Sequence, residues 1–102
     1  MTHIMKIDEM AQSMFYYWNI SKATEDWEVL EIVASSEDDE KSFRTADAAY
    51  NAGLRELKRN YKDGVFMLEV HYENLDRFPK QDSINYENGY IALSVNGKVQ
   101  EV

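Results

Sequence analysis

The feature that most constrains this fold is an amphipathic stretch in the middle of the chain. Tyr50, Leu54, Leu57 and Tyr61 recur at the i, i+4, i+7 and i+11 spacing of one helical face. Ala46 and Gly53 fall on the same side. The spacing predicts a helix over residues 46–62 whose apolar stripe must be covered by another layer of structure.

Residues typical of helix ends border this stretch. Thr45 is a suitable N-cap, because its hydroxyl can accept a hydrogen bond from the free N–H groups of the first turn. Gly64 is expected to stop the helix, with Lys62 in the last turn. Gly53 in a helix interior costs about 1 kcal/mol relative to alanine. We therefore expect the helix to approach a sheet closely at Gly53.

Two further segments have the composition of β-strands. Residues 27–34 (WEVLEIVA) are partly apolar on both faces, which predicts a strand in the centre of its sheet. Residues 65–72 (VFMLEVHY) alternate so that one face carries Phe66, Leu68, Val70 and Tyr72.

The dipeptide Asn88-Gly89 lies between two alternating runs and predicts a β-hairpin over residues 82–95. A two-residue turn there places on one face Ile84, Tyr86, Ile91, Leu93 and Val95. The dipeptide recurs at Asn96-Gly97. A tight turn at that point would put Lys98 and Gln100 on the Leu93 face, so we expect a looser turn or a frayed end.

Two regions fit more than one structure. Apolar residues in 6–18 follow the helical period, which favours a helix, whereas the aromatic run at 15–18 is typical of a strand over 14–20. The polar residues 35–42 predict a turn, followed by a short return strand over 41–44. Together the elements predict one α+β domain over residues 1–102, with a mainly antiparallel sheet of four or five strands and one or two helices on one face.

Composition narrows the classes of function. The 102-residue chain carries a net charge of −8 and no cysteine, which excludes disulfides and thiolate chemistry. Its apolar runs are shorter than the roughly 20 residues that span a bilayer, and residues 1–12 lack the apolar segment of a signal peptide. We expect a cytoplasmic protein with no membrane contact. The spacing of acidic residues and histidines predicts no catalytic, metal or cofactor site.

Two charged clusters are candidate interaction surfaces. The basic cluster lies on one face of the predicted helix and consists of Arg55, Lys58, Arg59 and Lys62. The acidic cluster, which lacks the glycine and spacing of a calcium loop, consists of Glu37, Asp38, Asp39 and Glu40. We interpret the basic cluster as the hydrated side of a packed helix, and the acidic cluster as a solvated turn that could contribute to an electrostatic interface.

Two other groups have an alternative interpretation. His71 and Glu69 share a strand face, where a Glu–His pair could transfer protons. No nucleophile motif accompanies them, so we interpret them as a structural pair. The aromatic residues at 15–18 and Trp27 could stack on bases, but the acidic residues 25–28 favour a core or a hydrophobic protein surface.

The segments DEMAQSM and FRTADAAYNAGLRELK, separated by a tryptophan-bearing strand, resemble the layout of short uncharacterised proteins of bacteriophages and mobile elements of gut bacteria. The resemblance covers about residues 8–62. It implies a small accessory protein and no particular activity.

Three functions are consistent with these observations. The leading hypothesis is a non-enzymatic accessory domain that binds a protein partner and could form a homodimer. The first alternative is an acidic nucleic-acid mimic that inhibits a nuclease or a DNA-binding protein. The second alternative is nucleic-acid binding through the basic cluster, which the net negative charge disfavours.

Overall fold

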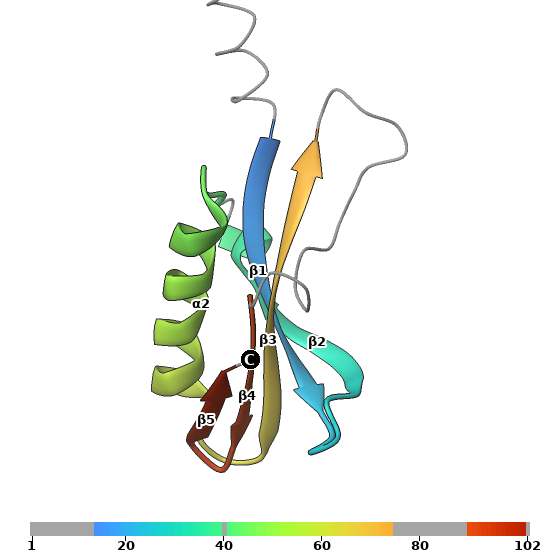
Figure 1. Ribbon diagram of the computed structural model, residues 1–102. Coiled ribbons are helices and arrows are strands. Elements are labelled where there is room, and N and C mark those ends of the chain that lie inside the picture. Colours follow the sequence, from blue (N-terminus) through green and yellow to red (C-terminus); the bar gives the residue numbers. More distant parts are fainter. Residues whose placement is uncertain (1–13, 40, 75–89, 102) are drawn as a thin grey trace, which may run out of the picture.

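The computed structural model describes residues 14–39, 41–74 and 90–101. In these residues, five antiparallel strands form one sheet in the order β2-β1-β3-β4-β5, and one α-helix packs on one of its faces (Figure 1). The elements are β1 (Met14–Ala23), β2 (Val29–Ser35), the 3-10 helix η1 (Ser36–Asp39), α2 (Ala46–Asn60), β3 (Val65–Asn74), β4 (Ile91–Val95) and β5 (Lys98–Glu101). The predicted α+β class is confirmed.

Helix α2 begins where its capping residue predicts. Thr45 has an extended backbone, and its Oγ1 accepts a 3.1 Å hydrogen bond from the N–H of Ala48. The helix ends at Asn60, two residues before the predicted end, and the N–H of Tyr61 closes the last turn on the carbonyl of Leu57. Gly64, with φ of 112°, lies in the turn that follows and not at the helix end itself.

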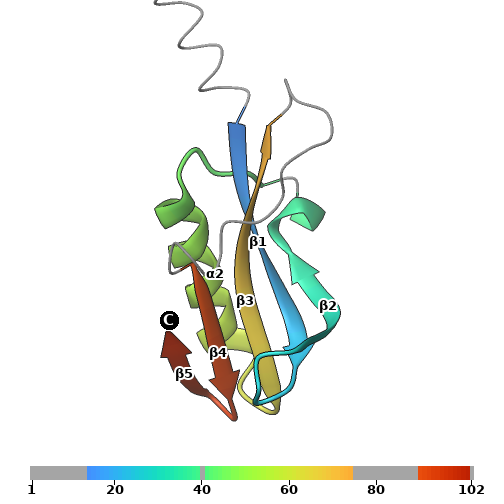
Figure 2. The same ribbon diagram turned by 45° about the vertical axis from the view of Figure 1, so that its right-hand side comes forward.

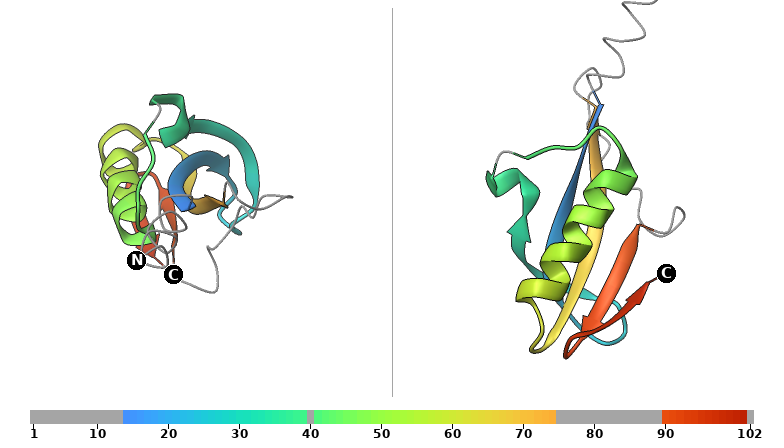
Figure 3. Two further views of the ribbon diagram at one scale, coloured as in Figure 1. Left: turned by 90° about the horizontal axis from the view of Figure 1, so that it is seen from above. Right: turned by 90° about the vertical axis from the view of Figure 1, so that its left-hand side faces the viewer.

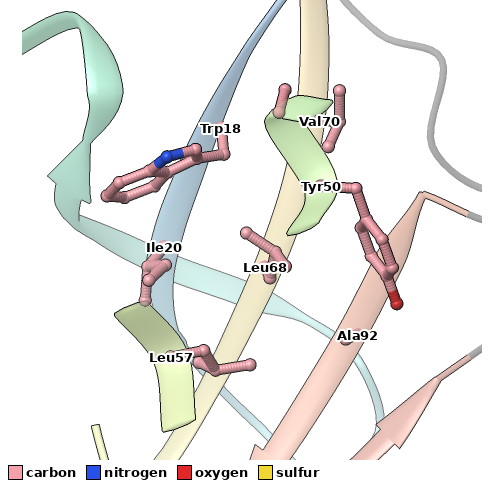
Figure 4. Close-up of a cluster of buried hydrophobic side chains, with 8 residues drawn as sticks. Trp18, Ile20, Tyr50, Leu57, Leu68, Val70 and Ala92 are labelled. Carbon is pink, nitrogen blue, oxygen red and sulfur yellow. The ribbon is translucent and has the colours of Figure 1, made fainter. Parts of the chain in front are cut away.

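The main core lies between α2 and the sheet. Figure 4 shows Tyr50 and Leu57 of α2 facing side chains of β1, β3 and β4. The buried members of this cluster are Trp18, Ile20, Ala49, Tyr50, Leu57, Leu68, Val70 and Ala92. The face predicted for residues 65–72 is therefore the one that contacts the helix.

Gly53 lies at the closest approach of α2 to the sheet. A Cβ atom on Gly53 would contact Cδ1 of Leu68 and lie 3.1 Å from Cβ of Trp18, tighter than ordinary packing. The absence of a side chain thus lets the helix backbone rest on β1 and β3, which confirms the expected packing role.

Strand β1 corrects the prediction of a helix over residues 6–18. Residues 14–18 are β-strand, and the competing prediction of a strand over 14–20 is confirmed; residues 6–13 lie outside the described part of the chain. The strand is favoured because β1 pairs with β2 on one side and β3 on the other. Its alternation also sends Trp18 and Ile20 toward α2.

Strand β2 was predicted to be central, and that prediction is wrong. It stands at one end of the strand order, opposite β5 (Figure 2). Its register with β1 shifts twice, which leaves Leu30 and Val33 as extra residues. These β-bulges break the strict alternation on which the prediction of two half-apolar faces depended.

The predicted return strand over 41–44 is reduced to a single bridge between Phe43 and Tyr16. The looser turn expected at Asn96-Gly97 is also wrong. Asn96 and Gly97, with φ of 50° and 87°, form a tight turn that pairs Val95 with Lys98. Lys98 and Gln100 do lie on the Leu93 face of the sheet, which is turned away from the helix. Both side chains are exposed on this outer strand, so their polar groups stay in water.

Within the hairpin predicted over residues 82–95, residues 91–95 form strand β4, and Ile91 and Leu93 share one face as predicted. That face is turned away from α2 and packs with Ala23 and Met67. The predicted Asn88-Gly89 turn, with Ile84 and Tyr86, lies outside the described residues.

Candidate functional site

The candidate site is a pocket between α2 and β2, which we call the α2–β2 pocket. Helix α2 crosses β1 and β3, with β2 and η1 to one side of it and β4 and β5 to the other (Figure 3, right). The space on the β2 side is a cavity of about 480 Å³. It is lined by Trp18, Val33, Ala34, Ser35, Asp38, Lys41, Phe43, Ala52, Arg55, Glu56 and Arg59.

Backbone contacts to β1 hold the wall of the pocket that follows β2. The N–H of Trp18 donates a 3.0 Å hydrogen bond to Oγ of Ser36, which is buried at the start of η1. Further along β1, Tyr16 and Phe43 exchange two backbone hydrogen bonds of 2.8 Å. Along this edge of β1, backbone groups therefore form hydrogen bonds first with β2, then with Ser36 and then with Phe43. These bonds fix Phe43 in the lining of the pocket.

The bulge at Val33 shapes the β2 wall. Ala34 pairs with Ile20, whose side chain faces α2, whereas Ile32 pairs with Ser21 on the opposite face. Because Val33 is the extra residue between these pairs, both Val33 and Ala34 turn toward the pocket. A regular strand would have pointed one of them away.

Charged side chains surround the apolar floor. Arg55 and Arg59 come from α2 and Lys41 from the segment after η1. All three side chains are exposed, and none of them makes an ion pair or a side-chain hydrogen bond with the described part of the chain. Of the two acids in the lining, Glu56 accepts a 2.7 Å hydrogen bond from Asn60. Three uncommitted cations and two acids give the rim a positive excess.

The structure separates the residues of the two predicted charged clusters. It brings Arg55, Arg59 and Asp38 into the lining of the α2–β2 pocket, and leaves Lys58, Lys62 and Glu37 exposed outside it. The Asp39 side chain and Glu40 lie outside what the structure describes. The sequence favours a core or protein-surface role for Trp18 and does not identify Phe43 or Lys41 as site residues. Their proximity to α2 depends on the Ser36 and Phe43 contacts to β1.

A second distinctive surface lies on β2. Val29, Leu30 and Ile32 are 44%, 64% and 58% exposed, the large exposed hydrophobic residues of the described chain. Val29 and Ile32 pair with Ala23 and Ser21, which places them on the face opposite α2. We call these three residues the β2 patch. Exposed acids adjoin it in the β1–β2 turn, namely Glu25, Asp26 and Glu28.

Polar side chains line part of the sheet face opposite α2. His71 Nε2 lies 3.9 Å from Oε1 of Glu69, as their shared face predicts, and the His71 ring stacks on Tyr17. Asn19 pairs with Glu69, and its buried Oδ1 has no hydrogen-bond partner among the described residues, which is also true of Oγ of Ser21. The Glu–His pair is therefore embedded in a polar strip of the sheet.

Tyrosines tie the two ends of α2 to the sheet. Burial and a hydrogen bond to Glu101 raise the pKa of Tyr50 well above its usual range. The 2.9 Å hydrogen bond to Asp47 raises the pKa of Tyr90, and burial raises that of Tyr61. These phenols stay protonated at neutral pH and act as hydrogen-bond donors or packing groups.

Comparison with protein-family models, with curated proteins and with solved structures finds no match to this chain. No helix within the described residues combines the length and apolar character needed to cross a membrane.

Proposed function

We propose that this chain is a protein-interaction domain that uses the β2 patch to bind a partner surface with an apolar centre and a basic rim. The observation that carries the proposal is the exposure of Val29, Leu30 and Ile32 next to one another on an outer strand. Interfaces commonly combine an apolar centre with a polar rim, and contiguous exposed apolar side chains mark such sites.

The acids around the patch define the charge of the partner. Glu25, Asp26 and Glu28 adjoin the patch in the turn that precedes β2, whereas Glu31 lies on the other face of the strand, 3.9 Å from Nζ of Lys22. Lysines or arginines on the partner would meet opposite charge, which raises the association rate and rejects acidic surfaces. A second copy of this chain would bring the same acids face to face, so self-pairing is disfavoured.

Side chains, more than backbone pairing, support recognition at this edge. The bulges at Leu30 and Val33 leave only a short regular stretch of β2 for another strand to pair with. The exposed side chains of Leu30 and Ile32 are the groups that a partner would cover. At about 25 cal/mol per Å² of apolar area removed from water, burying such side chains contributes substantially to binding.

A selection from a random peptide-display library on the immobilised protein tests the proposal. We expect enriched peptides to combine apolar residues with lysine or arginine, and to bind more weakly as salt increases. The double variant Leu30→Lys/Ile32→Lys should lose this binding by about tenfold or more. The matched control Ala48→Lys/Asn51→Lys adds the same charge at exposed positions of α2 and should retain it.

Three results would overturn the proposal: enrichment of acidic peptides, equal binding by both double variants, or self-association. Light scattering measures the last of these. A wild-type dimer that becomes monomeric in the Leu30→Lys/Ile32→Lys variant, with no peptide binding, would identify a second copy as the occupant of the patch.

The acids of residues 25–38 favour a second candidate, the mimic that occupies a basic cleft of a nuclease or DNA-binding protein. This candidate depends on carboxylates, whereas docking at the β2 patch depends on apolar contact. The uncharged double variant Leu30→Ser/Ile32→Ser separates the two candidates. It should abolish binding of selected peptides at the β2 patch, but a charge mimic would keep its affinity for a basic partner.

A further inference from the structure

The α2–β2 pocket combines features of a small-molecule site. Its volume of about 480 Å³ lies within the roughly 300–1,000 Å³ of common ligand pockets. The floor is apolar, formed by Trp18, Phe43 and Ala52 from three separate segments. In the described part of the chain no hydrogen bond engages the indole N–H of Trp18, so the lining also carries an unused donor.

The cations at the rim lie on two sides of this floor. Arg55 and Arg59 stand one turn apart on α2, and Lys41 belongs to the segment between η1 and Phe43. Arginine presents a planar fork of donors that matches a carboxylate in two parallel hydrogen bonds. Since these three side chains lack ion pairs among the described residues, an anion could engage them without breaking existing bonds.

We propose that the α2–β2 pocket binds a small organic carboxylate with an apolar body. The apolar body lies against Trp18 and Phe43, and the carboxylate meets the guanidinium groups of Arg55 and Arg59 at the rim. Glu56 is the acid that α2 contributes to the lining, and its carboxylate accepts a hydrogen bond from Asn60. Arg55 and Arg59 are therefore the charged groups of that wall that can bind an anion.

The charge pattern favours a small monoanion over other ligands. A cationic ligand would meet Arg55, Arg59 and Lys41 together. A nucleic acid would also meet the field of a protein whose net charge is −8. A small carboxylate needs only the local positive excess at the rim, and it leaves the rest of the surface untouched.

The α2–β2 pocket is separate from the β2 patch. Val33 and Ala34 face the pocket, whereas Val29 and Ile32 lie on the other face of the sheet. Loss of one function therefore leaves the other intact.

Titration with naphthoate, followed by amide and indole NMR signals of the full chain, tests the proposal. We expect the Trp18 indole and the backbone amides of Ala52 and Phe43 to shift on saturation, while the signals of Val29 and Ile32 remain in place. Naphthamide has the same apolar body and no charge, and should bind about tenfold more weakly. Equal affinities for the acid and the amide would overturn the proposed role of the arginines.

A matched pair of charge reversals locates the site. Arg55→Glu/Arg59→Glu should weaken naphthoate binding by at least about tenfold, whereas Lys58→Glu/Lys62→Glu changes the net charge equally on residues outside the pocket and should change it little. All four positions are exposed, so both variants should fold. Equal losses in the two variants would mean that the general field, and not the pocket, attracts the ligand.

A variant that fills the pocket gives a second, charge-independent test. Ala52 lines the cavity and leucine is a good helix former, so Ala52→Leu should close the floor while α2 persists. Naphthoate binding should disappear. Retained binding in Ala52→Leu, or competition by a short oligothymidine that depends on Arg55 and Arg59, would overturn the assignment, the latter in favour of a nucleic acid.

Discussion

The hydroxyl of Tyr50 on α2 donates a 2.6 Å hydrogen bond to Oε1 of Glu101 on β5. The two residues are 51 positions apart, and the bond joins the first half of the helix to the outer strand at the C-terminal end of the sheet. Hydrogen bonds to charged groups contribute more than neutral ones, so this contact tethers a strand of only four residues.

We expect Tyr50→Phe to lower the free energy of unfolding by about 1 kcal/mol, because it removes the donor and leaves the exposed carboxylate to water. Urea denaturation monitored by circular dichroism measures the change. Glu101→Gln keeps an acceptor oxygen and should cost less. Unchanged stability in Tyr50→Phe would show that the contact contributes nothing to folding.

Burial of Tyr50, together with the same contact, makes stability depend on alkaline pH. Because the folded state raises the pKa of Tyr50, the folded chain keeps a proton that the unfolded chain releases above about pH 10. The stabilisation is therefore complete below that pH and declines as pH rises beyond it. Wild-type stability should fall more steeply than that of Tyr50→Phe above pH 10, as measured by urea midpoints. Parallel pH profiles would contradict this.

Gly53→Ala tests the close approach of α2 to the sheet. Alanine favours the helix by about 1 kcal/mol, but its Cβ would press on the fully buried Leu68 and on the Cβ of Trp18. Overpacking costs about 1–3 kcal/mol, so we expect a net loss of about 1 kcal/mol in chemical denaturation. The exposed neighbour Asn51→Ala should instead stabilise slightly. Stabilisation by Gly53→Ala would show that Leu68 and Trp18 move enough to accommodate the added methyl group.

The N-cap of α2 can be tested separately from its packing. Thr45→Ala removes the acceptor of the Ala48 N–H and should cost about 1 kcal/mol in thermal or urea unfolding. Thr45→Ser keeps the hydroxyl and should retain most of the stability. If both variants lose equally, the threonine methyl group, and not the cap, is what matters.

The apolar stripe of α2 is tested by comparing two leucines. Leu57 is fully buried and Leu54 is only half-buried. Leu57→Ala should cost about 2–5 kcal/mol, as cavity-forming substitutions do, and Leu54→Ala distinctly less. Equal losses in calorimetry would mean that the helix is rotated relative to the sheet.

The sequence predicted best where one local pattern decides the structure. Residues 46–60 carry both a capping threonine and a helical period, and the helix formed with its predicted face inward. Residues 14–18 satisfy a helical and a strand pattern together, and only pairing with β3 and the bridge from Tyr16 to Phe43 decide between them. Whether these residues form a helix or a strand thus depends on pairing with segments distant in sequence, and a short stretch of sequence contains no information about them.

The candidate site could be predicted only in part. The sequence identifies Arg55 and Arg59 as charged surface. It does not show that Trp18 and Phe43 line the same pocket, because β1 and its contact with Ser36 bring them there. The β2 patch was missed because the bulges at Leu30 and Val33 change which residues share a face. A one-residue shift reverses every later side chain in a strand, and the sequence gives no local sign of it.

The two outer strands of the sheet, β2 and β5, limit pairing with further strands in different ways. β2 bears bulges, and β5 is four residues long and ends in an exposed charge. Neither offers a long flat row of amides of the kind that templates fibrils. A contact made at Leu30 and Ile32 is therefore one between side chains, which can join two molecules without extending the hydrogen-bonded sheet.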